Sequence, residues 1–322
     1  MSLIKEVPRL AAKYAVACPG QGYIRPQGYL TPYKQYKKEI SPILEEIDES
    51  LGFKFTDHLF EENPDTNNVF FRHTSNAQPA IVATTYVIHQ LYEQIYGVNL
   101  AKGASFLLGH SLGEYSALLL KGSLTFSQVL QLVRKRGELM EKMFPSEEYG
   151  MYAVNLRPAN FEKVLEIVQG LGVLANINGK FQLTLLGPLD SVEESIKDLT
   201  NQKLIIKGVK LPVTIPFHSS VLAPIESHLL DLVNLFPKFP EALPDPPYIV
   251  SNLAGHTLGP DTLTEIGSTI AANLKPVQWL ASLENLLRDG VTQVLCLGPG
   301  KPVHGLVLKS GLFETFYVDA DA

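Results

Sequence analysis

The feature that most constrains the fold is Gly-His-Ser-Leu-Gly at residues 109–113, which matches the pattern G-x-S-x-G. An apolar run at 105–108 precedes it and predicts a strand, and the run at 112–120 predicts a helix that Gly122 ends. A sharp strand-to-helix turn needs small residues beside the serine, because the serine backbone is strained there. The motif therefore predicts an α/β sheet with covering helices, and it presents Ser111 as a nucleophile.

Ser111 is expected at the N-terminus of the predicted helix. Free N–H groups and the helix dipole favour a developing negative charge at such a place. We therefore expect the N–H of Leu112 to be the first donor to an oxyanion. The alternative is a chance match in a strand-to-helix turn, and the flanking strand and helix weigh against it.

A serine nucleophile needs a base, and the chain contains eight histidines. His110 adjoins Ser111, but neighbours at a strand end point to opposite faces, so His110 is a poor candidate. His218 follows Pro216 and Phe217 in an apolar stretch where a histidine is unusual. A buried structural histidine remains the alternative for each of the eight, so composition alone does not select the base.

A second chemical signal is an arginine on the apolar side of a predicted helix at residues 125–144. Arg136 lies on the apolar stripe, three residues after Val133 and four before Met140. A buried arginine needs an anionic partner, because an unpaired buried charge is costly. The partner is either an internal Asp or Glu or a substrate carboxylate held by paired hydrogen bonds. The second alternative implies an acyl group with a free carboxylate beside Ser111.

Residues 151–211 follow a different rhythm from the rest of the chain. Their pattern predicts a strand, a helix, two strands joined by an Asn-Gly turn at 178–179, a helix and a final strand. This β-α-β-β-α-β order is typical of ferredoxin-like units. We therefore expect a small subdomain at 151–211, inserted into a large α/β domain of residues 1–150 and 212–322.

Composition weighs against several other classes. The 322 residues are 45% hydrophobic and 19% charged, as in an ordinary globular protein. The formal charge of −6 disfavours nucleic-acid binding, which normally needs a basic surplus. No apolar run reaches the roughly 18 residues of a membrane span, so no membrane partner is expected. Cys18 and Cys296 are expected to be buried, reduced thiols.

Six motifs occur in the order found in one enzyme family. They are Pro-Gly-Gln-Gly at 19–22, Gly-His-Ser-Leu-Gly-Glu at 109–114, Arg-Gly at 136–137 with Met140, Pro-Phe-His at 216–218, Pro-Val-Gln-Trp at 276–279 and Gly-Pro-Gly-Lys at 298–301. With them the chain resembles malonyl-CoA:acyl carrier protein transacylases and the related acyltransferase domains of fatty-acid and polyketide synthases. The resemblance runs from about residue 15 to about residue 310, so it covers nearly the whole chain.

The resemblance implies roles for eight residues. They are Ser111 as nucleophile, His218 as general base, Gln278 as support for the histidine, Gln21 and Leu112 as the oxyanion hole, and Arg136, His110 and Phe217 as substrate-binding residues. A bulky Phe217 ring would crowd an α-methyl branch, so malonyl is expected to be preferred over methylmalonyl. The fold it implies is a large hydrolase-like α/β domain with a mainly parallel sheet, carrying a ferredoxin-like subdomain.

The activity that the resemblance implies is ping-pong transfer of malonyl from malonyl-CoA to the phosphopantetheine thiol of an acyl carrier protein. The intermediate is malonyl-Ser111, and the product supplies fatty-acid synthesis. No metal and no permanently bound cofactor are expected, because malonyl-CoA is a substrate and the carrier brings its own phosphopantetheine. A monomer is expected.

A serine esterase or thioesterase of the α/β-hydrolase type is the main alternative, since it shares the G-x-S-x-G turn. Such enzymes place an acid and then a histidine near the C-terminus, where His304 is the candidate here. Arg136 has no obvious use in a hydrolase of neutral esters. A non-catalytic carrier-binding protein is a third class, and the combined presence of the motif residues argues against it.

The Pro-Phe-His form resembles fungal mitochondrial members of the family, which favours the mitochondrial matrix; a bacterial source would mean the cytoplasm. The basic residues Lys5, Arg9 and Lys13 are either the stub of a transit peptide or a solvated tail.

Overall fold

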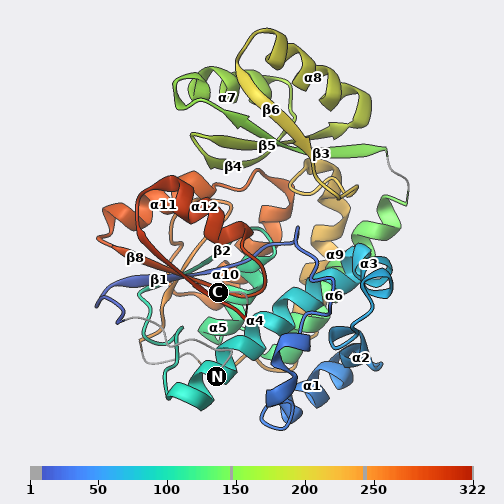
Figure 1. The fold of residues 1–322 in the computed structure, drawn as a ribbon, viewed down its shortest axis with the longest axis vertical. Helices are drawn as coiled ribbons and strands as arrows, with labels where there is room; N and C mark the ends of the chain where they lie inside the picture. Colours follow the sequence, from blue (N-terminus) through green and yellow to red (C-terminus); the bar gives the residue numbers. More distant parts are fainter. Residues whose placement is uncertain (1–8, 146–147, 242–244, 321–322) are drawn as a thin grey trace.

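The computed structural model describes residues 9–145, 148–241 and 245–320. Within these ranges the strands form two sheets (Figure 1). Sheet A is parallel throughout and has the order β7-β2-β1-β8-β9. Sheet B is antiparallel and has the order β4-β5-β3-β6. The expectation of an α/β fold with a mainly parallel sheet is confirmed. Lys5 lies outside the described residues.

The strands are β1 (Tyr14–Cys18), β2 (Phe106–Gly109), β3 (Tyr149–Leu156), β4 (Leu174–Gly179), β5 (Gln182–Pro188), β6 (Ile205–Lys210), β7 (Tyr248–Val250), β8 (Gln293–Leu297) and β9 (Glu314–Val318). The α-helices are α1 (Ser41–Leu51), α2 (Phe55–Leu59), α3 (Pro64–Arg72), α4 (Thr74–Tyr96), α5 (Gly113–Lys121), α6 (Phe126–Met143), α7 (Phe161–Gly170), α8 (Leu189–Asn201), α9 (Ala223–Asn234), α10 (Thr262–Ala271), α11 (Trp279–Arg288) and α12 (Pro302–Ser310). Short 3₁₀ turns are η1 (Thr31–Tyr36), η2 (Pro158–Asn160), η3 (Ser220–Leu222) and η4 (Ala272–Leu274).

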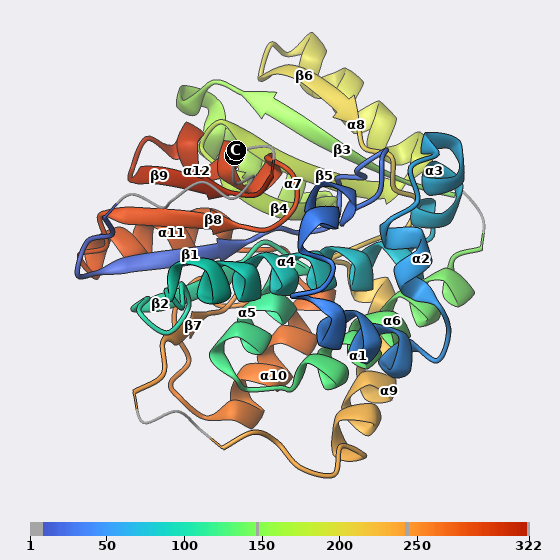
Figure 2. The ribbon, with the colours of Figure 1, turned by 60° about the horizontal axis from the view of Figure 1, so that its bottom comes forward.

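Sheet A is covered by helices on both faces. Its central strand β1 is buried along its whole length, as a doubly covered parallel sheet requires. Val16 packs into an apolar cluster with α4, α5 and α6, whereas Ala15 and Ala17 pack into a second cluster with α11 and α12. Figure 2 shows these two helix layers on either side of the sheet. The carboxyl ends of β1, β2 and β8 meet at one edge, where parallel sheets usually bind ligands.

Sheet B carries its own apolar cluster beneath α7 and α8, at the top of Figure 1. The predicted β-α-β-β-α-β order of this segment is confirmed as β3, α7, β4, β5, α8 and β6. The strand β4 also joins the rest of the chain, because Ile177 N donates to Val277 O at 2.9 Å and Val277 N donates to Ala175 O at 3.0 Å. This short parallel bridge ties sheet B to the segment just before α11.

Residues 33–60 read as helical from the sequence, but they do not form one continuous helix. The chain forms η1, α1 and α2 there, and Gly52 ends α1 in the left-handed conformation at φ 77°. Strands β7 and β9 are not predicted from the sequence. Both are edge strands of sheet A. Because β7 spans only Tyr248–Val250 and β9 is only partly buried, neither carries a strong apolar pattern.

No helix in the described part of the chain is long and apolar enough to cross a bilayer. The same residues contain no group of three or more His, Cys, Asp or Glu side chains arranged to hold a metal ion. Cys18 and Cys296 are both buried and unpaired, as predicted.

Candidate active site

The turn between β2 and α5 holds Ser111 in a left-handed conformation at φ 54°, which is strained for a residue with a side chain. Its two glycines allow the turn to close. A Cβ on Gly109 would lie 1.8 Å from the carbonyl carbon of Gly113, and a Cβ on Gly113 would lie 2.2 Å from the Cys18 oxygen. The G-x-S-x-G spacing is therefore required by contacts within the turn and with β1.

Asn252, which follows β7, holds this turn from outside. Its Oδ1 accepts a hydrogen bond from Ser111 N at 2.9 Å, and its Nδ2 donates to Gly109 O at 2.6 Å. Its backbone N and its Nδ2 both donate to Glu114 Oε2, the former at 2.8 Å. The N–H of Ser111 is thus occupied, whereas the N–H of Leu112 donates to no described residue.

Glu114 is a buried carboxyl group, 1% exposed, that also accepts from the Thr269 hydroxyl at 2.8 Å. Burial raises the pKa of Glu114 to about 7, and the nearby Glu265 adds to the rise against the hydrogen bonds from Asn252 and Thr269. Glu114 belongs to the family motif at 109–114, but no role was assigned to it from the sequence, because its contacts with Asn252 and Thr269 come from distant segments.

We expect Glu114→Gln to change how stability depends on pH. Because the pKa of Glu114 rises from 4.5 to about 7 on folding, its proton contributes stability below pH 4.5, and this is lost as the pH rises through 7. The shift corresponds to roughly 3 kcal/mol. Urea unfolding across this pH range should therefore show that the free energy of unfolding of the variant increases relative to that of the wild type as the pH rises. A difference between the two proteins that stays constant with pH would contradict the buried carboxyl.

His218 lies directly against the serine, although 107 residues separate them. Its Nε2 is 2.6 Å from Ser111 Oγ, and its Nδ1 is 2.9 Å from the carbonyl oxygen of Ala272. A carbonyl can only accept, so Nδ1 carries the proton and Nε2 is free to accept from the serine hydroxyl. Burial lowers the pKa of His218 to about 3, and the charges of Arg136 and His110 add to this.

The prediction that Gln278 supports the histidine is wrong. Its side-chain amide donates to Pro276 O at 3.1 Å, and its backbone N donates to Asn252 O at 2.8 Å. The partner of the imidazole is a backbone carbonyl, that of Ala272. Side-chain chemistry cannot reveal a backbone partner, so the sequence carries no signal for it.

Gln21 lies in the loop after β1 and lines the same cavity as Ser111. Its Nε2 donates to the Thr74 hydroxyl at 3.2 Å, and its Oε1 accepts from Gln78 Nε2 at 3.3 Å. Both partners are on the first turns of α4. This fixes the orientation of the Gln21 amide and leaves one N–H of its Nε2 for the cavity.

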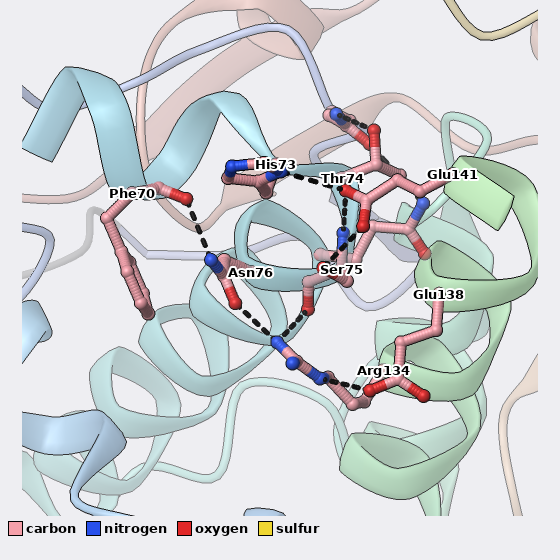
Figure 3. Close-up of polar contacts among 10 residues, drawn as sticks. Phe70, His73, Thr74, Ser75, Asn76, Arg134, Glu138 and Glu141 are labelled. Atoms are coloured by element: carbon pink, nitrogen blue, oxygen red, sulfur yellow. Dashed lines mark hydrogen bonds and ion pairs between the residues drawn. The ribbon is translucent and has the colours of Figure 1, made fainter. Parts of the chain in front are cut away.

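The start of α4 is in turn bound to α6, as Figure 3 shows. Glu141 accepts from the backbone N and the hydroxyl of Ser75 at 3.0 and 2.8 Å. Arg134 Nη1 donates to Ser75 O at 3.0 Å, an oxygen that Pro79 leaves without its usual helical donor. These contacts make α4 a rigid support for Gln21.

Arg136 points inward from α6, as predicted, and is 2% exposed. Its Nε donates to Asn273 Oδ1 at 2.8 Å, and its guanidinium lies 5.5 Å from the Tyr115 ring centre and 5.9 Å from that of Phe217. It forms no ion pair with an Asp or Glu of the described residues. The alternative of an internal carboxylate partner is therefore not realised there.

These side chains surround one cavity of about 450 Å³ between the two sheets. Its lining includes Gln21, His110, Ser111, Arg136, Asn178, Phe217, His218 and Lys301. Sheet B contributes part of the wall, and the His110 Nε2 to Asn178 Oδ1 contact of 2.8 Å joins the serine turn to β4. Six of the eight predicted site residues therefore line this cavity. Gln278 and Leu112 do not line it, although Leu112 directly follows Ser111 in the chain.

Comparisons with known proteins agree with this geometry. The family model described as an acyl transferase domain matches residues 33–266. A malonyl CoA-acyl carrier protein transacylase from Staphylococcus aureus is 30% identical over 312 residues, covering 92% of each chain. One from Bacillus subtilis is 29% identical over 309 residues, covering 92% of this chain and 90% of that protein. The crystal structure of an acyl-carrier-protein-S-malonyltransferase from Bartonella henselae superposes with a TM-score of 0.82, at 27% identity and 95% coverage of both chains. This chain belongs to the malonyl CoA-acyl carrier protein transacylase family of acyl transferases.

Proposed function

We propose that the protein transfers malonyl from malonyl-CoA to the phosphopantetheine thiol of an acyl carrier protein, by a ping-pong mechanism through malonyl-Ser111. The product supplies fatty-acid synthesis. The observation that carries the proposal is the meeting of Ser111, His218 and Arg136 in one cavity. A serine with a base accounts for acyl transfer, and a buried arginine without a carboxylate partner accounts for an acyl group that brings one.

In the first half-reaction, His218 Nε2 takes the proton of Ser111 as Oγ attacks the thioester carbonyl carbon. The oxyanion accepts hydrogen bonds from the Leu112 N–H and from Gln21 Nε2. When the tetrahedral intermediate collapses, the C–S bond breaks and the coenzyme A thiolate leaves with the proton held by His218. The malonyl group remains as an ester on Ser111.

In the second half-reaction the thiol of the carrier's phosphopantetheine enters the same cavity. His218 takes its proton, the sulfur attacks the ester carbonyl, and Ser111 leaves with the proton returned by His218. One imidazole serves both directions because Ala272 holds its Nδ1 proton throughout. The low basicity of the imidazole comes from its burial, which lowers the pKa of His218, whereas the hydrogen bond to the Ala272 carbonyl acts in the opposite direction.

The hydrolase alternative is not favoured by the arrangement of the site. Enzymes of that class use a late histidine, and His304 lies on α12 with its ring 5.4 Å from that of Tyr317. His218 already occupies the position beside Ser111. A hydrolase of neutral esters also has no obvious use for a buried arginine that lines the acyl pocket.

The test of function is incubation with malonyl-CoA in the presence and absence of a phosphopantetheinylated acyl carrier protein. We expect malonyl-carrier to form rapidly, and free malonate to appear only slowly when the carrier is omitted. Rapid malonate release without carrier would favour the thioesterase instead.

The pH profile of the acylation step follows from His218. Because its pKa is lowered to about 3, Nε2 stays unprotonated well below pH 6.5, and kcat/KM should stay nearly constant from about pH 8 to about pH 5. The measurement should use malonyl-pantetheine, which lacks the coenzyme A phosphates that titrate near pH 6. Because the buried carboxyl of Glu114 near the serine turn has a pKa of about 7, a fall with a midpoint near 6.5 would mean that the imidazole has an ordinary pKa only if Glu114→Gln shows the same fall.

Several finer features belong to the same proposal. Residues 1–150 and 212–322 form the hydrolase-like large domain and 151–211 the ferredoxin-like subdomain, which the strand order of sheet B supports. No metal or resident cofactor takes part, and the protein acts as a monomer in the mitochondrial matrix, or in the cytoplasm of a bacterium. Phe217 restricts the acyl group to one without an α-methyl branch.

A further inference from the structure

Two adjacent residues of the η4 turn each contact a different member of the site. The carbonyl oxygen of Ala272 accepts from His218 Nδ1 at 2.9 Å, and Asn273 Oδ1 accepts from Arg136 Nε at 2.8 Å. The proposed base and the arginine are therefore both hydrogen-bonded to the same short turn. Displacing one relative to the other would require this turn to move.

The orientation of the Asn273 amide is determined by its other contacts. Its Nδ2 donates to Ile270 O at 2.8 Å and to the Tyr115 hydroxyl at 3.2 Å, and the residue is only 2% exposed. A flipped amide would place its NH₂ against the guanidinium, where no acceptor is present. Only the oxygen can face Arg136.

Two other buried cations of the described residues are each paired with a carboxylate. Arg25 is paired with Asp319, and Lys121 with Glu265 at 2.5 Å, and both pairs are almost completely buried. Arg136, which lines the cavity, instead receives an uncharged acceptor from the neighbouring turn. A carboxylate at 273 would bind Nε equally well, but it would also neutralise the guanidinium before a substrate arrived.

We propose that Asn273 is a specificity-determining positioning residue, which orients Arg136 through a neutral contact and keeps its charge and remaining N–H groups available for the carboxylate of the acyl group. This inference rests on the proposed malonyl transfer. Burial without a carboxylate partner lowers the pKa of Arg136, so an incoming anion would stabilise the charged form.

The test compares acylation of Ser111 by malonyl-CoA and by acetyl-CoA, measured separately as kcat/KM. In Asn273→Asp we expect the malonyl value to fall about 30-fold or more while the acetyl value changes only a few-fold, because only malonyl needs the free charge of Arg136. Asn273→Ala keeps that charge but frees the guanidinium, so a smaller fall of about 10-fold in the malonyl-to-acetyl ratio is expected. If Asn273→Asp fails to fold, the malonyl-to-acetyl ratio of Asn273→Ala alone tests the positioning role.

Asn67→Asp is the matched control. Asn67 is also buried, and its Nδ2 also donates to two acceptors, here the carbonyl oxygens of Pro26 and Glu61, but neither of these acceptors lines the cavity. The malonyl-to-acetyl ratio of kcat/KM in Asn67→Asp should stay at the wild-type value. Equal losses for both acyl groups in the Asn273 variants would reduce Asn273 to a structural residue and overturn the inference.

Arg136→Ala separates this inference from the function on which it rests. If that variant lowers the malonyl-to-acetyl ratio and both Asn273 variants do not, the positioning role is refuted and the proposed function stands. If Arg136→Ala leaves the ratio unchanged as well, the arginine does not bind the acyl carboxylate and the positioning role of Asn273 fails with that contact, whereas the proposed transfer fails only if the wild type forms no malonyl-carrier.

Discussion

Ser111→Ala is expected to abolish the covalent malonyl-enzyme and to lower kcat by roughly 10⁶-fold, as removal of a serine nucleophile does elsewhere. The reason is geometric. Ser111 Oγ is 2.6 Å from His218 Nε2, so it is the hydroxyl that the imidazole can deprotonate. Alanine removes that oxygen and leaves the turn intact.

Mass spectrometry of the intact protein after exposure to malonyl-CoA measures this directly. The wild type should gain the mass of one malonyl group, and Ser111→Ala should gain none. Ser116→Ala is a suitable control, since Ser116 is a buried serine on α5 whose hydroxyl has no hydrogen-bond partner in the described structure, and it should label normally. Persistent labelling of Ser111→Ala would remove the nucleophile assignment.

Arg136→Ala is expected to cost malonyl transfer far more than acetyl transfer. Leaving a desolvated carboxylate without its charged partner costs about 2–5 kcal/mol, or roughly 30- to 5,000-fold in kcat/KM. Acetyl has no carboxylate, so any fall in kcat/KM for acetyl transfer should come only from changed packing against Tyr115 and Phe217.

Parallel kinetics with the two thioesters provide the measurement, and Arg134→Ala provides the control. Arg134 lies on the same helix but contacts the start of α4 and Glu138, away from the cavity. Its replacement should affect malonyl and acetyl transfer to the same degree. If Arg136→Ala also reduced both equally, the carboxylate contact would have to be abandoned.

The sequence predicted those parts of the site that depend on nearest neighbours along the chain. Ser111 needed only a strand, two glycines and a helix around it, and each is within a few residues. Arg136 could be placed inside because the 3.6-residue period of α6 puts it on the stripe of Val133 and Met140. The element order of sheet B followed from the same kind of local pattern.

The failures involve contacts between distant segments. Gln278 was assigned to His218 through the resemblance alone, and the fold places Ala272 there instead. Asn252 and Asn273 contact Ser111 and Arg136 across 141 and 137 residues, and neither stands out in the sequence. An asparagine has no periodic apolar signal, so its partner is visible only when the chain has folded.

The sequence by itself determined the strained serine turn, the inward arginine and the succession of helices and strands, because backbone sterics and helical or strand periodicity act over a few residues. Only the tertiary structure decided that His218 meets Ser111 across 107 residues, and that the η4 turn holds both the imidazole and the guanidinium. Such contacts depend on how the helices and the two sheets pack together, and no local rule contains that information.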